Sequence, residues 1–115
     1  MRELTSHKVN GVNDGLQIVV LDEPGPGGAH HKYGINLLTN QGCSGPIISF
    51  QNGPIKEAGV NGVTNESLLA ILIDRLECFQ SGPFACEENA EALDDLRHAL
   101  RRLRFRTKTR LARGV

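Results

Sequence analysis

The chain has 115 residues, the length of one ordinary domain, and 39% of them are hydrophobic, with four phenylalanines and no tryptophan. So small and aliphatic a core favours burial of further surface in an oligomer. Thirteen basic residues balance thirteen acidic ones, but every acid lies at or before Asp95 and eight basic residues follow from Arg97 onward, which indicates an anionic partner.

Secretion and membrane insertion are not expected. Cys43, Cys78 and Cys86 are odd in number and lack the spacing of a metal site or a disulfide framework, which is typical of a reducing compartment. The sequence has no signal-peptide pattern, and no apolar run approaches the ~20 residues that span a bilayer. We therefore expect a soluble, cytoplasmic protein.

Residues 1–62 are predicted to be rich in β-structure. They contain most of the glycines and four of the five prolines, and short β-type runs stand between these breaks. The clearest strand is expected at 16–21, followed by 32–38 and 46–50, with 53–58 as a fourth candidate. Asn-Gly and Asp-Gly pairs, as in the turn at 13–15, favour tight turns. Spacing this close favours an antiparallel meander.

After Gly62 the apolar period becomes helical. Thr64 or Asn65 can cap a helix, and the segment Ser81-Gly82-Pro83 ends it, because Gly tolerates a left-handed turn and Pro cannot continue the helix. The apolar stripe of this helix recurs at spacings of three, four and three residues: Leu69, Leu72, Leu76 and Phe79.

A second helix is predicted over about 86–110, with the stripe Leu93, Leu96, Leu100 and Leu103. Glutamates crowd its start and arginines its end, which suits the helix dipole. Two such stripes joined by a short break predict an antiparallel αα-hairpin. We therefore expect an α+β fold in one domain, 1–115, with a small antiparallel sheet in 1–62 and the hairpin in 63–115.

The basic end of the second helix is the first candidate for binding: Arg97, Arg101, Arg102, Arg104, Arg106, Lys108, Arg110 and Arg113. Arginine offers a planar fork of donors that suits phosphate. The alternatives are a solvated surface that balances the acidic first turns and a nucleic-acid-binding module. These charges surround the helix instead of lining one face, so duplex binding is not the favoured reading.

Phe79, Phe84 and Asn89 cluster around the predicted hairpin turn. An aromatic ring there can pack into the core, or it can stack on a base, which is worth ~1–3 kcal/mol. The amide of Asn89 can read a base edge or a ribose, or it can face water. Both readings of these residues stay open from the sequence.

Catalytic and metal sites find little support. The loop at 24–28 lacks the Gly-Lys-Ser/Thr ending of a P-loop, and His30 breaks the dinucleotide fingerprint. The histidines, including His31, have no carboxylates at metal-site spacing. No nucleophile is paired with a base at a readable spacing. We expect a binding protein that is not an enzyme and needs no metal or cofactor.

Several segments resemble a known family. They are 50–57 (FQNGPIKE), 59–63 (GVNGV), 69–76 (LAILIDRL), 79–84 (FQSGPF), 88–90 (ENA), 106–107 (RT) and 113–115 (RGV), with a looser match at 22–25 and 27–29. Together they resemble the phage Thoeris anti-defence proteins of the first type. That family shares its C-terminal hairpin with the phage sponges that block cyclic-oligonucleotide (CBASS) signalling.

The resemblance implies a sponge that acts in the host cytoplasm. Such a protein captures the cyclic ADP-ribose isomer made by a bacterial TIR-domain enzyme, so that the downstream effector is not switched on. Family members assemble as dimers or hexamers, and the nucleotide lies where β loops and hairpins of neighbouring protomers meet. Some also hold cyclic di- or trinucleotides at separate sites.

The resemblance also implies roles for five residues. Phe79 would stack on the adenine, Asn89 would hydrogen-bond the ligand and Arg106 would meet the pyrophosphate. Arg110 and Arg113 are expected to be further ligand-binding residues.

Overall fold

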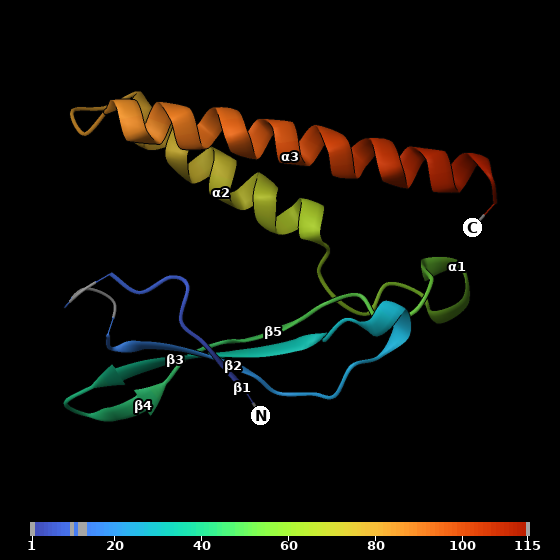
Figure 1. Cartoon of the computed structure of the whole chain (residues 1–115), viewed down its shortest axis with the longest axis horizontal. Coiled ribbons are helices and arrows are strands. Elements are labelled where there is room, and N and C mark those ends of the chain that lie inside the picture. The colour runs from blue at the N-terminus through green and yellow to red at the C-terminus, as the bar shows by residue number, and fades with distance from the viewer. Residues whose placement is uncertain (1, 10, 12–13, 115) are drawn as a thin grey trace. The chain divides into compact units, whose positions relative to one another are not determined.

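The computed structural model describes residues 2–9, 11 and 14–114 (Figure 1). An antiparallel sheet in the N-terminal half precedes two long helices, so the predicted α+β class is confirmed. The chain divides into two compact units, Met1–Val63 and Thr64–Val115. That these units fold as one domain stays a prediction.

The sheet has β3 at its centre. In order, the strands are β1 (Arg2–Leu4), β2 (Leu16–Val20), β3 (Lys32–Thr39), β4 (Gly42–Ser44) and β5 (Ile47–Ser49). Strands β1 to β4 follow one another across the sheet, and β5 pairs with the first half of β3, whose second half pairs with β4. All pairs are antiparallel. The three clearest predicted strands are confirmed, whereas β1 and β4 were not foreseen; the expected turn at 13–15 includes residue 13, which is outside the described residues.

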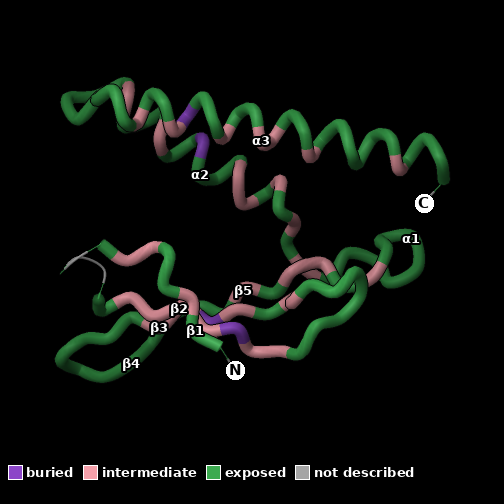
Figure 2. Tube along the Cα trace, in the orientation of Figure 1, coloured by how far each residue is buried: buried purple, intermediate pink, exposed green. Residues whose placement is uncertain are grey.

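The core of this unit forms where the end of β2 pairs with the start of β3. Val20 pairs with Tyr33 and is 1% exposed, and Figure 2 shows buried segments within these strands. The rings of Tyr33 and Phe50 meet edge to face, with centroids 5.7 Å apart. β-branched and aromatic side chains pack well on a pleated surface, which explains why β2 and β3 pair at this point.

The fourth strand expected at 53–58 is wrong, because the structure has a short helix there, α1 (Ile55–Ala58). Proline fixes φ near the helical value, and the Pro54 carbonyl accepts a hydrogen bond from the Ala58 amide at 2.8 Å. Gly59, with a φ of 72°, then ends the helix in the left-handed region that glycine tolerates.

Side-chain amides hold the loop around α1 in shape. The Gln51 amide donates to the carbonyls of Gly53 and Gly59 at 3.1 and 2.8 Å and accepts from the Asn61 amide N–H at 3.0 Å. The Asn61 side chain bonds both backbone groups of Asn52 at 2.8 Å. The amide-rich segment at 50–62 therefore has a structural role in this unit.

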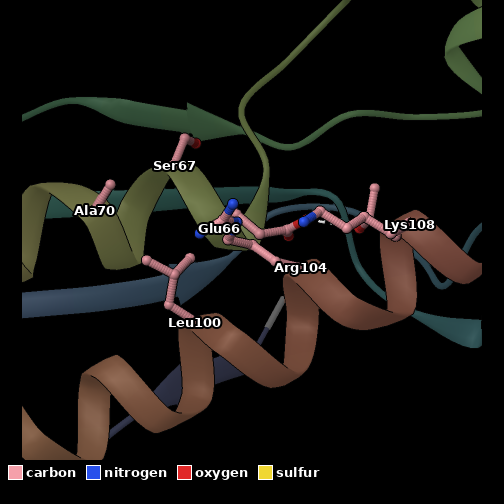
Figure 3. Close-up of a pocket in the computed structure, with 7 residues that line it drawn as sticks. Glu66, Ser67, Ala70, Leu100, Arg104 and Lys108 are labelled. Carbon is pink, nitrogen blue, oxygen red and sulfur yellow. Dashed lines mark hydrogen bonds between the residues drawn. The ribbon is translucent and has the colours of Figure 1, made fainter.

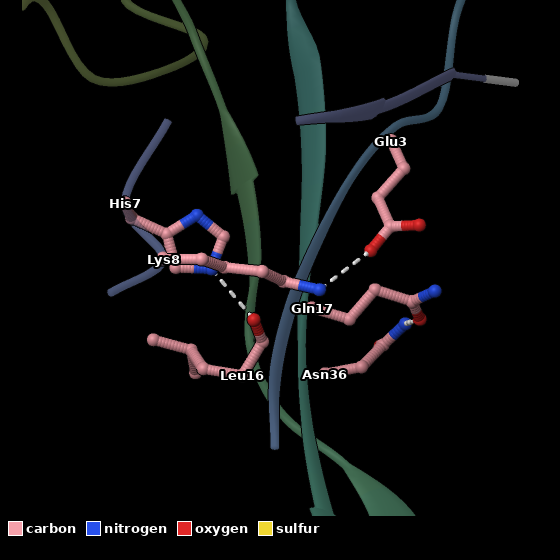
Figure 4. Close-up of polar contacts among 6 residues, drawn as sticks. All are labelled: Glu3, His7, Lys8, Leu16, Gln17 and Asn36. Carbon is pink, nitrogen blue, oxygen red and sulfur yellow. Dashed lines mark hydrogen bonds and ion pairs between the residues drawn. The ribbon is translucent and has the colours of Figure 1, made fainter. Parts of the chain in front are cut away.

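Polar contacts also tie the N-terminal segment to the sheet (Figure 4). A ring nitrogen of His7 lies 2.6 Å from the Leu16 carbonyl oxygen. Across β2 and β3, the Asn36 amide donates to the Gln17 side-chain oxygen at 3.0 Å. Such cross-strand pairs help to fix strand register.

Asp22 organises the start of β3. Its carboxylate accepts hydrogen bonds from the backbone amides of His31 and Lys32, at 2.9 and 3.2 Å, and lies 3.7 Å from Nδ1 of His30. Desolvation by itself would raise the pKa of Asp22. The two amide donors and the nearby imidazoles outweigh it, so the pKa lies below its ordinary value of 3.8.

Replacing Asp22 with asparagine should lower stability in a pH-dependent way. A carboxyl group whose pKa falls on folding stabilises the fold above its unfolded pKa, and this stabilisation is lost as pH falls through the lower folded pKa. We expect Asp22→Asn to lower the melting temperature at pH 7, with the difference from the unchanged protein shrinking below pH 3.8. Thermal unfolding across pH measures both, and a difference that stays constant would contradict this role.

The second unit consists of α2 (Asn65–Gln80) and α3 (Glu87–Ala112), so both predicted helices are confirmed within two residues at each end. Thr64 and Ser67 exchange side-chain and backbone hydrogen bonds in a capping box, which starts α2. Ile73 and Leu93 are buried, at 8% and 4% exposure. Among the described residues, no helix has the length and apolar character needed to cross a membrane.

Truncating Leu93 should destabilise this unit strongly. Leu93→Ala would leave a cavity between the helices, and we expect a loss of roughly 2–5 kcal/mol in the free energy of unfolding. Leu111→Ala is the matched control, since Leu111 lies on the same helix and is 58% exposed; its effect should stay within about 0.5 kcal/mol. Urea denaturation measures both, and equal losses would contradict this packing.

Candidate functional site

Two polar contacts fix the register of α2 against α3. Arg97 donates to Glu77 at 2.9 Å, and Thr107 donates to Glu66 at 2.8 Å. The pairs are eleven residues apart on α2 and ten apart on α3, so the helices run antiparallel with nearly constant register. By this register, Phe79 lies opposite Asp95.

The predicted site residues lie largely on one side of the hairpin. With 3.6 residues per turn, the contacts Glu77–Arg97 and Glu66–Thr107 mark one flank of the helix pair. The same period places Phe79 of α2 on the opposite flank, together with arginines of α3 that include Arg106, Arg110 and Arg113. Asn89 points between these flanks, towards α2. The second flank therefore collects the ring and the guanidinium groups.

Along the hairpin axis, however, the five residues form two groups. Phe79 lies opposite Asp95, and Asn89 is six residues before Asp95 on α3, a distance of about 9 Å along the axis at 1.5 Å per residue. Arg106 is eleven residues after Asp95, or about 17 Å in the opposite direction. We call Phe79 and Asn89 the turn group, and Arg106, Arg110 and Arg113 the tail group. One chain thus places all five on neighbouring faces but does not bring them into one cluster.

The turn group stands beside a closed hairpin turn. The Gln80 side chain accepts from the Cys86 amide at 2.9 Å and donates to the Cys86 carbonyl at 3.0 Å, which joins the end of α2 to the start of α3. Phe79 is 38% exposed and Asn89 is half-buried. A partly exposed ring can stack on a nucleobase, and a side-chain amide can hydrogen-bond a base edge or a ribose.

The tail group carries guanidinium donors that no other described residue engages. Arg106 and Arg113 are exposed and Arg110 is half-buried. Within the described part of the chain, none of the three has an ion pair or a side-chain hydrogen bond, in contrast to Arg97, which is bound to Glu77. Free guanidinium forks of this kind suit the oxygens of a phosphate.

A groove of ≈ 450 Å³ lies on the flank that carries the Glu66–Thr107 contact (Figure 3). The sequence did not reveal it. Its lining residues are Glu66, Ser67, Ala70, Leu100, Arg104, Thr107 and Lys108. Because Glu66 places a carboxylate beside the two cations, the groove suits a phosphate less well than the tail group does. Finding it required the register of the two helices, which neither helix sequence contains.

Arg75 is a second feature that sequence reasoning missed. Its guanidinium carbon lies 5.2 Å from the centroid of the Phe79 ring. The two residues are four apart on α2, a spacing at which helical side chains meet, so this signal was present in the sequence. Elsewhere, no three His, Cys, Asp or Glu side chains of the described residues form a group that could hold a metal ion.

Comparison with known proteins places the hairpin in context. The family described as "Acb2/Tad1, hairpin domain" matches residues 45–105, which include the turn group and end just before the tail group. A curated relative, "Thoeris anti-defense 1" of Bacillus phage SBSphiJ7, is 50% identical over 68 residues, covering 59% of this chain and 48% of the relative. The chain thus spans about half the length of this relative.

Proposed function

Because this chain belongs to the Acb2/Tad1 hairpin domain family, we propose that it is a phage anti-defence protein that sequesters cyclic ADP-ribose-type signals without cleaving them. In the host cytoplasm, such capture would keep the signal of a TIR-domain enzyme from its effector and block Thoeris signalling. Cyclic di- or trinucleotides of CBASS are further candidate ligands. The name of the relative, "Thoeris anti-defense 1", supports the anti-defence role.

The observation that carries the proposal is the chemistry that the hairpin places on neighbouring faces. Phe79 offers a partly exposed ring for the adenine. Asn89 offers an amide for the base or ribose. Arg106 offers guanidinium donors for the pyrophosphate, and Arg110 and Arg113 offer further donors for the ligand. These groups bind and orient a nucleotide, which is all that sequestration requires.

The spacing of the two groups supports a site shared between subunits. About 17 Å along the axis separates Phe79 from Arg106 on one chain. In a dimer or hexamer, the turn group of one protomer can face the tail group of another, so that one ligand contacts both. A shared pocket also explains how so short a chain could enclose a dinucleotide.

Tight capture requires several contacts of this kind at once. Nanomolar affinity requires about −12 kcal/mol. A stacked base contributes ~1–3 kcal/mol, and each hydrogen bond to a charged group contributes about 1.5–3 kcal/mol. The ring and the arginine–phosphate bonds must also offset the free-energy cost of immobilising the ligand, which is smallest when the site is rigid before binding.

Calorimetric titration with a panel of cyclic ADP-ribose isomers and cyclic oligonucleotides tests the proposal. We expect tight binding of at least one isomer, and recovery of that ligand intact after heat denaturation of the complex. Phe79→Ala should weaken binding about 5- to 150-fold, because the stacking energy is lost. Arg106→Ala should weaken it at least tenfold, because a charge-assisted bond is lost.

Two variants serve as matched controls. Phe105→Ala removes a ring that is 73% exposed on a different face of α3, and Arg101→Ala removes an exposed arginine that lies about 140° round the helix from Arg106. Both should bind the ligand as the unchanged protein does. Recovery of hydrolysed ligand would instead identify an enzyme, and equal losses in the control variants would contradict the assigned residues.

A nucleic-acid-binding module is the alternative. Of the eight basic residues that follow Asp95, only Arg97 has a carboxylate partner in the described part of the chain, which leaves a large excess of positive charge. Phosphate-backbone binding of this kind weakens steeply with salt. Under the sponge proposal, a gel-shift experiment with duplex DNA or RNA should show no retardation at low salt; retardation that disappears with added salt would favour the alternative.

A further inference from the structure

The contact between Arg75 and Phe79 affects which face of the Phe79 ring a ligand can reach. The guanidinium carbon is 5.2 Å from the ring centroid, within the ~6 Å range of a cation–π interaction. A planar guanidinium over an aromatic ring covers one of its two faces. Since Phe79 remains 38% exposed, the interaction leaves part of the ring accessible to another partner.

Arg75 is free to hold this position. The carboxylate of nearby Glu77 is bound to Arg97 at 2.9 Å, and no ion pair or side-chain hydrogen bond of the described residues involves Arg75. Its only described partner is the Phe79 ring. An arginine side chain has many rotamers, so an acidic neighbour that paired with it would draw its guanidinium away from the ring.

We propose that Arg75 is a positioning residue: it backs the Phe79 ring on one face and thereby holds the other face ready to stack on the base of the bound nucleotide. This inference rests on the proposed function. A ring whose orientation is fixed before binding loses less conformational freedom when the ligand arrives, which raises affinity. The guanidinium, the ring and the base would then form a three-layer stack.

A double-mutant cycle in the calorimeter tests the proposal, with the cyclic ADP-ribose isomer that the unchanged protein binds most tightly. Arg75→Met keeps an unbranched side chain of similar reach but removes the cation. At exposed sites a cation–π contact is weak, so we expect roughly two- to fivefold weaker binding. In a Phe79→Leu background, the same change should have no further effect, because no ring remains to be held.

Further variants separate this role from charge and folding effects. Arg101→Met makes the same charge change at an exposed arginine of α3 and should leave affinity unchanged. Arg75→Lys, which retains a cation, should restore part of the loss. Melting temperatures show whether each variant is folded; Arg75→Glu gives a second test if Arg75→Met is not, and it should weaken binding further.

The outcomes are distinguishable. Equal losses with and without the Phe79 ring would overturn the positioning role, because Arg75 would then act on the ligand by itself. Unchanged affinity of Arg75→Met would overturn it as well. Failure of the unchanged protein to bind any compound of the panel would remove the proposed function, and this inference with it.

Discussion

The structure of the C-terminal unit depends on one constraint: in an antiparallel pair of helices, each helix buries a single stripe against the other. Ile73 and Leu93 occupy the centre of that contact. The neighbouring apolar side chains lie on the flanks, where Leu72 is 47% and Phe79 is 38% exposed. The exposed ring is therefore a direct result of the fold, and the same geometry makes it accessible to a ligand.

The charge pattern follows from the same arrangement. α2 has too few acidic residues at its start to neutralise the basic end of α3, and its Glu66 is engaged by the Thr107 hydroxyl. The positive charges at the end of α3 therefore repel one another in the free protein. An anion that bound among them would gain their attraction and would also relieve their mutual repulsion, so these charges favour an anionic ligand over a neutral one.

Much of the fold could be predicted because its signals are local. Thr64 caps α2 and Ser81-Gly82-Pro83 ends it, so the boundaries of this helix were correct. The strand at 53–58 failed because Pro54 and Gly59 together specify a helical turn that apolar alternation does not reveal. The groove beside Glu66 depends on the pairing of two helices distant in sequence, and neither period encodes it. The roles of the five site residues stay predictions.

The placement of Phe79 and Arg106 on one flank follows from the pairing of the two helices and not from the period of either helix alone. The period of each helix places Phe79 or Arg106 beside the apolar stripe of its own helix. It does not show whether the two residues lie on the same side of the helix pair. In an antiparallel pair, residues reached by turning in the same direction from the apolar stripe of each helix lie on the same side of the pair. The Glu77–Arg97 contact identifies one of these two sides. Phe79 and Arg106 must then share the other side. Because they stand apart along the axis, a nucleotide that bridges them between protomers would stabilise the assembly by its binding free energy, so capture and oligomerisation would be thermodynamically linked.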